Sequence, residues 1–300
     1  MQLFLENIDT NSRSGPNSFA NKLLPHLKSL GHSFTTPESA DVALCFIESH
    51  VPTLPCPRVL RLDGIYFNEA QNYEMQNRNI KRTYEESEGV VFQSDFCKEL
   101  IVRYFGDPKN SIVIRNGADT RAIDRIVPMS KESYDNVWCC ASSWRPHKRL
   151  TENIRYFREH KGSNDILIIA GEVPDKERVE DPSIIYFGNL NQVQLYSLYK
   201  ASKYFLHLAW LDHCPNVVVD ARACGSHIIC SSAGGTREIA GMNSTIIQEE
   251  EWDFKPTMLY NPPTMDFAKK IENNFESIYD MKEVTREYST FMEKIYASSS

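Results

Sequence analysis

The sequence predicts an α/β protein built from two doubly wound domains. Short apolar segments alternate with segments of helical periodicity, a pattern typical of parallel sheets covered on both faces. This alternation runs twice along the 300 residues, and residues 117–135 between the two runs lose apolar periodicity. A chain of this length accommodates two domains. We therefore expect domains over 1–120 and 121–274 that face a central cleft.

Apolar segments mark the strands of the first domain. They lie at 3–7, 42–47, 58–63, 89–94 and 111–116. Residues 18–31 carry apolar residues at helical spacing and end on Gly31, as helices often do. Gly15 and Pro16 form the loop after the first strand. Asp63 follows the third strand with a glycine, where it is either a ligand contact or a turn residue.

A second series of strands follows the linker, which includes residues 125–135. Its segments lie at 136–143, 165–171, 183–189, 203–210 and 226–233. The aromatic-rich residues from about 275 to 300 have helical periodicity and are expected to return as a helix that braces the first domain. Neither domain has G-x-G-x-x-G after its first strand, so the dinucleotide-binding fingerprint is absent.

Composition limits the function classes. The net charge of −7 and the pI of about 5.7 argue against nucleic acid as the main partner. No apolar run reaches the roughly 18–20 residues of a membrane-spanning helix, and the first residues lack a signal peptide pattern. The eight cysteines include no C-x-x-C pair, so we expect neither a zinc site nor a disulfide framework. A cytoplasmic protein is expected, and peripheral membrane contact stays open.

The segment 212–239 places acids among apolar residues that look fully buried. Pro215 suits the start of a helix and Gly225 its end. Asp212 lies just before that helix, at the carboxyl end of strand 203–210, where open α/β sheets bind ligands and a helix N-terminus attracts anions. Asp212 and Asp220 are suited to accept sugar hydroxyls. The alternative is that Asp212 caps the helix and Asp220 is solvated.

A basic loop follows the first strand of the second domain. The stretch "SSWRPHKRL" (142–150) places Arg145, Lys148 and Arg149 at another strand end. Positive charge at this edge is suited to a diphosphate group. We expect Lys148 and Arg145, with the backbone of 214–217, to stabilise a departing diphosphate.

Together these motifs resemble glycosyltransferase family 4, retaining enzymes of the GT-B fold that use nucleotide sugars. The family's E-x7-E pattern has its counterpart in Asp212-x7-Asp220, followed by "ARACG", "HIICSSA" and Gly234-Gly235-Thr236-Arg237-Glu238. "VVFQSDFCKEL", "VIRNGAD" and "SGPNSFANKLL" extend the resemblance over nearly the whole chain. Both glutamates of the family pattern are aspartates here. Ser143 stands where the family has an arginine, and Arg145 is the candidate to replace its charge.

The resemblance implies a set of site residues in two Rossmann-like domains. Asp212 would hold a donor-sugar hydroxyl and Asp220 the ribose hydroxyls, so the implied catalytic residues are Lys148, Arg145 and Asp212. Glu238 is either a pocket residue or an ordinary acid at a helix start. The donor-binding set is Asp220, Cys214, Pro215, Asn216, Val217, Gly15, Pro16, Asn189, Gly234, Gly235 and Glu238, with Asp63 as a donor or acceptor contact.

The function implied is a retaining glycosyltransferase of hexosyltransferase type. It would move a sugar from a nucleoside-diphosphate sugar to a hydroxyl of a glycan, a lipid or another acceptor bound on the first domain. The chain contains no D-x-D, and we expect no metal and no cofactor beyond the donor substrate. The alternatives are a nucleotide-sugar-binding protein with reduced catalysis and a nucleotide-sugar epimerase of the same fold.

Overall fold

The computed structural model describes residues 1–12, 14–131 and 133–299. Glu132, inside the predicted linker, and Ser300, at the end of the predicted C-terminal helix, lie outside the described residues. The chain forms two compact units. Unit 1 comprises Met1–Ala118, Asp253–Thr257 and Ile278–Ser300, and unit 2 comprises Asp119–Trp252 and Met258–Ser277.

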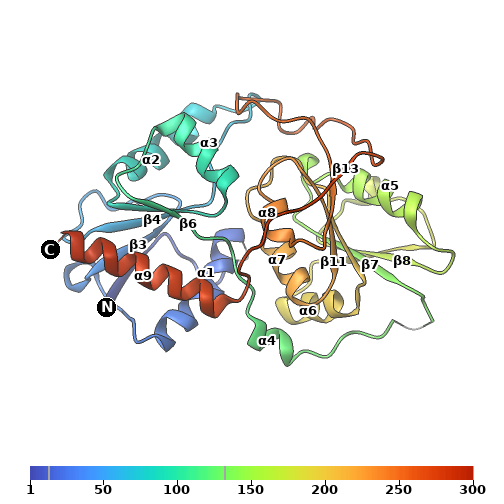
Figure 1. Ribbon diagram of the computed structural model, residues 1–300, viewed down its shortest axis with the longest axis horizontal. Helices are drawn as coiled ribbons and strands as arrows, with labels where there is room; N and C mark the ends of the chain where they lie inside the picture. The colour runs from blue at the N-terminus through green and yellow to red at the C-terminus, as the bar shows by residue number, and fades with distance from the viewer. Residues whose placement is uncertain (13, 132, 300) are drawn as a thin grey trace. The chain divides into compact units, whose positions relative to one another are not determined.

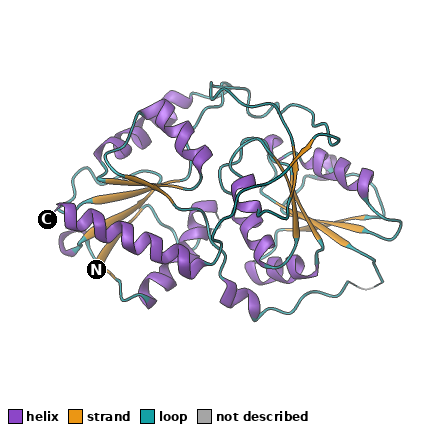
Figure 2. Ribbon diagram, in the orientation of Figure 1, coloured by secondary structure: helices purple, strands orange, loops and turns teal. Residues whose placement is uncertain are grey.

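Unit 1 is a parallel sheet with helices on both faces (Figures 1 and 2). Its strand order is β2-β1-β3-β4-β5-β6. The strands are β1 (Gln2–Glu6), β2 (Ser33–Phe34), β3 (Val42–Phe46), β4 (Arg58–Leu62), β5 (Gly89–Phe92) and β6 (Ser111–Val113). The helices are α1 (Gly15–Ser29), α2 (Tyr73–Glu86), α3 (Asp95–Phe105) and α9 (Met281–Ser299). A 3₁₀ turn, η1, covers Pro37–Ser39. The predicted strand segments all contain strands, and β2 is an addition.

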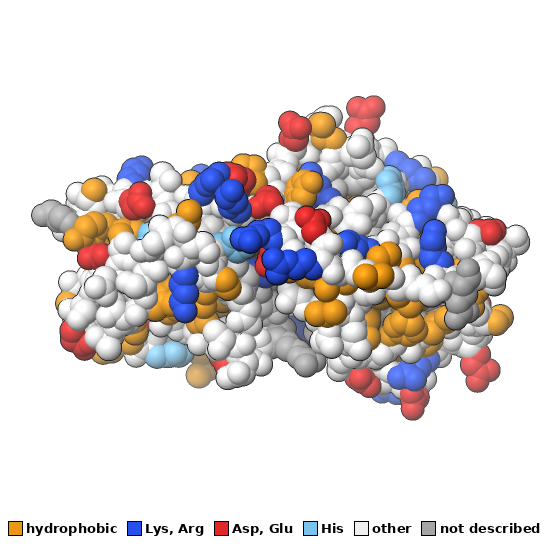
Figure 3. All heavy atoms as spheres, turned by 90° about the horizontal axis from the view of Figure 1, so that it is seen from below, with side chains coloured by type: hydrophobic (Ala, Val, Ile, Leu, Met, Phe, Trp, Pro, Cys, Tyr) orange, Lys and Arg blue, Asp and Glu red, His pale blue; other side chains and the backbone are white. Residues whose placement is uncertain are grey.

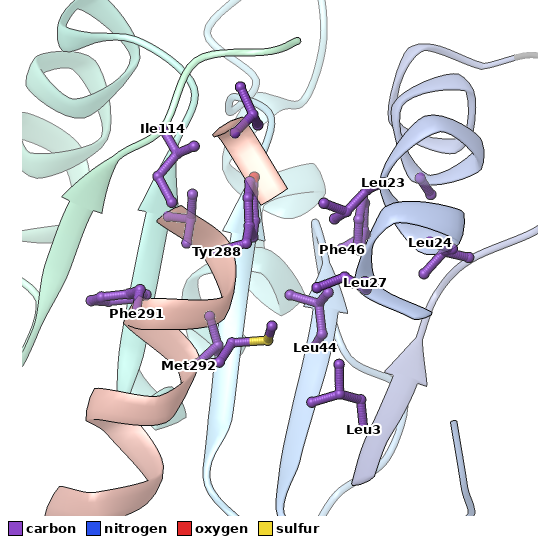
Figure 4. Packing of buried hydrophobic residues seen from close by; sticks show 14 of the residues in the cluster. Leu3, Leu23, Leu24, Leu27, Leu44, Phe46, Ile114, Tyr288, Phe291 and Met292 are labelled. Atoms are coloured by element: carbon purple, nitrogen blue, oxygen red, sulfur yellow. The ribbon is translucent and has the colours of Figure 1, made fainter. Parts of the chain in front are cut away.

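Helix α9 completes the core of unit 1. Its apolar side chains recur every three or four residues, which gives the helix one buried face. Tyr288, Phe291 and Met292 extend from α9 toward the sheet (Figure 4) and lie in one buried cluster with Leu27 of α1 and Leu44 of β3. Full burial of each such side chain contributes about 1.5–3 kcal/mol. The helix begins at residue 281 rather than near 275, so residues 275–280 are not helical.

Unit 2 contains a seven-stranded sheet in the order β13-β12-β11-β10-β7-β8-β9. Its strands are β7 (Val137–Ala141), β8 (Ile166–Ala170), β9 (Ile184–Gly188), β10 (Tyr204–His207), β11 (His227–Ser231), β12 (Thr245–Ile247) and β13 (Lys270–Ile271). Only β13 pairs antiparallel. The predicted strands are present, and β12 and β13 extend the sheet. The α/β class and the doubly wound sheets are thus confirmed.

Short helices surround this sheet. They are α4 (Thr120–Asp124), α5 (Leu150–His160), α6 (Gln192–Ala201), α7 (Asn216–Ala223) and α8 (Arg237–Ala240), with the 3₁₀ turns η2 (Pro146–Lys148) and η3 (Asp175–Glu177). Helix α4 ends just before the predicted linker of residues 125–135, in the stretch where the sequence loses its apolar periodicity. The segment after α4 is fixed to α6, because Lys200 donates to the Ile126 carbonyl at 2.9 Å.

Residues beyond 258 complete the core of unit 2. Met265 and Phe267 are buried in the cluster that also contains Phe157 of α5. The Arg155 guanidinium lies 3.8 Å from the centre of the Phe267 ring and donates to the Met265 carbonyl at 2.6 Å. This late segment is therefore an integral part of unit 2.

The surface drawn in Figure 3 mixes charged and apolar side chains, and most of the cysteines are buried. On the face drawn in Figure 3, Lys and Arg side chains lie among acidic, hydrophobic and uncharged ones. Among the described residues, no helix is both long and apolar enough to cross a bilayer. Cys45, Cys139, Cys140 and Cys230 are buried, and Cys224 is half-buried.

Candidate functional site

The candidate site lies where the chain changes direction in the sheet of unit 2. The chain runs outward from β7 through β8 and β9, and returns to β10 on the other side of β7. The loops that follow β7 and β10 therefore leave neighbouring strands in opposite directions at the carboxyl edge. Open α/β sheets bind ligands at this point. The loop after β7 carries Lys148, and the loop after β10 carries Asp212.

Lys148 and Asp212 meet at this point. The Lys148 Nζ donates to Asp212 Oδ2 at 2.5 Å, and the two side chains are 18% and 14% exposed. Burial alone raises the pKa of the Asp212 carboxyl. The Lys148 charge and a hydrogen bond from His207 outweigh burial and hold that pKa well below its usual range. Asp212 is therefore ionised at neutral pH, and the pair stays accessible to a ligand.

The backbone around Asp212 is fixed by the double glycine. Residues Asp212 and Gly234 form a parallel bridge, and the Gly235 N–H donates to the Asp212 carbonyl at 2.8 Å. Gly234 has a φ of 98°, and a Cβ there would lie 2.6 Å from the Asp212 carbonyl oxygen. Gly234 thus allows close packing of two backbones. Contact with the donor, which the family resemblance implies for both glycines, stays a prediction.

Backbone strain flanks both members of the pair. Leu211, just before Asp212, has a φ of 55°, and Arg149, just after Lys148, has a φ of 52°. The left-handed region is unfavourable for such residues, and strained residues cluster at functional sites. Each of the two loops that carry the pair thus has one left-handed residue next to it.

Arg149 holds the lysine loop in its strained conformation. Its side chain is only 1% exposed and forms two hydrogen bonds to the Glu249 carboxylate, at 2.9 and 2.7 Å. It also donates to the Pro263 carbonyl at 2.8 Å. Asn153 of α5 joins the two loops, since it donates to the Arg149 carbonyl at 2.8 Å and accepts from the Leu208 N–H at 3.3 Å. The sequence placed Arg149 in a strand-end loop suited to a diphosphate, whereas in the structure its side chain is buried and paired with Glu249.

Three histidines lie close to the pair, the buried His147 and His207 and the half-buried His213, and sequence reasoning missed them. His207, the last residue of β10, contacts Asp212 Oδ2 through Nε2 at 2.8 Å. Burial lowers its pKa. Burial also lowers the pKa of His213 to about 4 and that of His147 to about 3. All three are therefore neutral at neutral pH. The available signal was a histidine inside the apolar strand segment, five residues before an aspartate.

Helix α7 begins beside Asp212. The alternatives that Asp212 caps this helix and that Asp220 is solvated were both wrong. Pro215 is the N-cap, so the helix begins at Asn216, one residue later than the sequence predicted. No side chain caps this helix. Asp212 instead accepts from its neighbour, the His213 N–H, at 3.0 Å. Asp220 is buried at 9% exposure. Burial, and after it the nearby Asp220 charge, raises the pKa of Tyr196 in α6.

The other predicted residues are spread over both units. Arg145 is exposed and its carbonyl accepts from the Lys148 N–H at 2.8 Å. Asn189 is exposed after β9, whereas Glu238 is buried in α8. Cys214 is buried and Pro215, Asn216 and Val217 are half-buried at the start of α7. Gly15, Pro16 and Asp63 belong to unit 1, where Gly15 and Pro16 begin α1 and Asp63 is paired with the buried Arg61.

The described residues contain no group of three or more His, Cys, Asp or Glu side chains arranged to hold a metal ion. The site is therefore built from one lysine–aspartate pair, neutral histidines and the first turn of a helix. Such a set is suited to binding an anionic group that also carries hydroxyls.

Comparisons with known proteins agree with this fold. Residues 128–254 match the family described as "Glycosyl transferases group 1". The chain resembles HepE from Anabaena in complex with UDP and glucose, at 14% identity, a TM-score of 0.66 and coverage of 98% of this chain and 100% of the other. It also resembles a Rickettsia africae glycosyltransferase, at 16% identity, a TM-score of 0.63 and 98% coverage of both chains.

A third similar structure is a sucrose-phosphate synthase from Thermosynechococcus elongatus. Its identity is 12%, its TM-score is 0.63, and the alignment covers 99% of this chain and 97% of the other. No curated protein sequence matches the chain significantly. The fold is that of GT-B glycosyltransferases.

Proposed function

We propose that this protein is a retaining glycosyltransferase of hexosyltransferase type, similar to family 4, which acts without a metal ion. It transfers a sugar from a nucleoside-diphosphate sugar to a hydroxyl of a glycan, a lipid or another acceptor, and unit 1 binds the acceptor. The observation that carries the proposal is the accessible Lys148–Asp212 pair at the direction change of the unit 2 sheet. The family match of residues 128–254 supports it.

Lys148 is assigned the stabilisation of the leaving diphosphate. Breaking a sugar–phosphate bond leaves negative charge on the diphosphate, and fixed cations beside it lower the barrier. Lys148 supplies such a charge, Arg145 lies on the same turn, and the N–H groups of the first turn of α7 face the carboxyl edge. The segment Cys214–Val217 is assigned to this diphosphate. Gly15 and Pro16 keep the donor-binding role that the family resemblance implies for them.

The two acids are assigned to hydroxyl groups. An ionised carboxylate only accepts hydrogen bonds, so it suits a diol. Asp212 receives a hydroxyl of the donor sugar, and buried Asp220 receives the ribose. Asn189, Gly234, Gly235 and Glu238 complete the donor-binding set. Structures of Anabaena HepE contain UDP or UDP-glucose, which makes UDP-glucose the first donor to test.

The experiment compares Asp220→Asn with Asp212→Asn, with EDTA present throughout. Losing a charged hydrogen bond costs roughly 1.5–3 kcal/mol, which is about ten- to a hundredfold in Kd. Calorimetry should show that Asp220→Asn weakens binding of the nucleoside diphosphate by this amount. Asp212→Asn should keep the diphosphate affinity and lose turnover of the sugar nucleotide.

Each alternative leaves a different result. Tight binding without turnover in the wild-type protein would indicate a nucleotide-sugar-binding protein, and an epimeric sugar nucleotide as product would indicate an epimerase. Activity that disappears in EDTA and returns with Mg²⁺ or Mn²⁺ would contradict metal independence. Equal diphosphate affinity in both variants and the wild type would remove Asp220 from the donor site.

A further inference from the structure

Asp212 is held by three hydrogen-bond donors of unequal mobility. Oδ2 accepts from Lys148 at 2.5 Å and from His207 at 2.8 Å, while Oδ1 accepts from the His213 N–H at 3.0 Å. Lys148 reaches Asp212 on a flexible four-carbon chain from a loop. His207 belongs to strand β10, and its side chain is 4% exposed. The imidazole is therefore a fixed donor and the ammonium a movable one.

The charges of the donors differ as well. Lys148 is a cation and is attracted by any diphosphate that enters the site. His207 is neutral because burial lowers its pKa. A neutral N–H is not drawn toward an anionic ligand as an ammonium is. Binding of a diphosphate therefore pulls Lys148 away from Asp212 and leaves His207 where it is.

Asp212 needs a partner at that moment. It is 14% exposed, and without the Lys148 charge its burial favours the protonated carboxyl. A protonated or displaced Asp212 would no longer present two acceptor oxygens to a sugar hydroxyl. The remaining side-chain donor on Asp212, among the contacts described above, is His207.

We propose that His207 is a positioning residue that keeps Asp212 ionised and in place after Lys148 moves from Asp212 to the donor diphosphate. The inference rests on the proposed function. It assigns the Lys148–Asp212 contact to the unliganded protein and the His207–Asp212 contact to both states. His207 acts through Asp212 and does not contact the donor.

The test uses His207→Leu, which removes the donor N–H, and His207→Gln, whose side-chain amide places an N–H near the same point. A charged hydrogen bond is worth about ten- to a hundredfold, so kcat with the sugar nucleotide should fall by this factor in His207→Leu. The Kd for UDP, or for whichever nucleoside diphosphate binds, should stay within about twofold. His207→Gln should recover most of the lost kcat.

A double-mutant cycle with Asp212→Ala separates positioning from a general structural effect. If His207 acts through Asp212, adding His207→Leu to Asp212→Ala should lower kcat no further. The matched control is His227→Leu, because His227 lies on the neighbouring strand β11 and contacts Thr245 Oγ1 at 2.9 Å, away from Asp212. This control should keep wild-type kcat and Kd.

Three results would overturn the proposal. The first is that His207→Leu lowers kcat by the same factor in the wild type and in Asp212→Ala. The second is that His207→Gln folds but has a kcat as low as that of His207→Leu. The third is a large rise in the Kd of His207→Leu for the nucleoside diphosphate. A wild-type protein that neither binds nor turns over any sugar nucleotide would instead contradict the proposed function. In that case a pH titration of the Asp212 carboxyl by carbon NMR, with inorganic pyrophosphate present, still tests the contact. The carboxyl pKa should be higher in His207→Leu than in the wild type and in the control His227→Leu.

Discussion

Each unit places a cation–carboxylate pair at the carboxyl edge of its sheet, and the two pairs differ in their freedom. In unit 1, Arg61 pairs with Asp63 while its own side chain is only 1% exposed. Arg61 also donates to Gln93 at 3.2 Å and to Asn116 at 2.8 Å, and its guanidinium lies 4.1 Å from the Phe19 ring centre. In unit 2, Lys148 contacts Asp212 and is 18% exposed.

The difference shows which pair can exchange its partner for a ligand. A guanidinium is planar and holds several acceptors at once, whereas an ammonium is a compact charge on a flexible stem. Arg61 is fixed by contacts on its edge and on its face, so Asp63 is committed to holding it. Lys148 holds Asp212 through one flexible side chain, so the negative charge of a ligand can compete for its ammonium group. The pair in unit 1 is thus held on several sides, whereas the pair in unit 2 is suited to exchange its partner.

The largest effect is expected on stability, from Arg61→Met. Removing one partner of a buried ion pair typically costs about 3–5 kcal/mol, because the other charge is left uncompensated. Denaturant unfolding of unit 1 should show this loss. The control Arg286→Met breaks an exposed pair with Glu283 and should cost less than about 1 kcal/mol. Equal stability of both variants would mean that Arg61 is as replaceable as a surface residue.

The next effect is expected on activity, from Lys148→Ala. Loss of a fixed charge beside the leaving group should raise the barrier by about 3 kcal/mol, which is roughly a hundredfold in turnover. The variant should remain folded but lose some stability, because Asp212 loses the cation that keeps it ionised. Lys176→Ala, at an exposed position in η3 of the same unit, is the control for turnover. Near wild-type turnover in Lys148→Ala would remove this lysine from the mechanism and make the two pairs alike.

The smallest effect concerns pH and distinguishes the two edges by their titration. Burial lowers the pKa of His147 to about 3 and of His213 to about 4, whereas Arg61 does not titrate. Below pH 6.5 the unfolded chain binds protons that the folded state does not, so stability falls as pH decreases toward 4. Each such histidine contributes at most about 1.4 kcal/mol per pH unit.

Unfolding at pH 7 and pH 5 measures this slope. The variant His147→Gln should have a smaller slope than the wild type by about one proton. An unaltered slope in His147→Gln would show that His147 takes up a proton in the folded protein.

Periodicity predicted the main strands of both sheets because each is a continuous apolar run. It missed β2 and β13, which have two residues each, and β12, which has three, because strands this short carry too few apolar residues for a signal. The aromatic tail was predicted to become helical too early, since Phe275 and Ile278 fit the helical spacing although helix α9 begins at Met281.

The candidate site was predictable where it depended on strand ends, and not where it depended on which loops meet. Lys148 and Asp212 follow strands, so their edge could be predicted. Their contact requires β10 to lie beside β7, which strand order alone determines and sequence patterns do not encode. The buried pairing of Arg149 could not be predicted from the basic run, because its partner Glu249 is a hundred residues away in the sequence.

The segment after residue 258 has a consequence for how the protein can be divided. The match to group 1 glycosyltransferases ends at residue 254, yet Met265 and Phe267 fill the core of unit 2, and the Pro263 carbonyl binds Arg149 next to Lys148. A fragment cut where the match stops would expose apolar surface and release the lysine loop from one of its anchors. Unit 2 is therefore not a detachable module bounded by its recognisable sequence. A fragment that contains all of unit 2 must run to residue 277. It then also includes residues 253–257, which belong to unit 1.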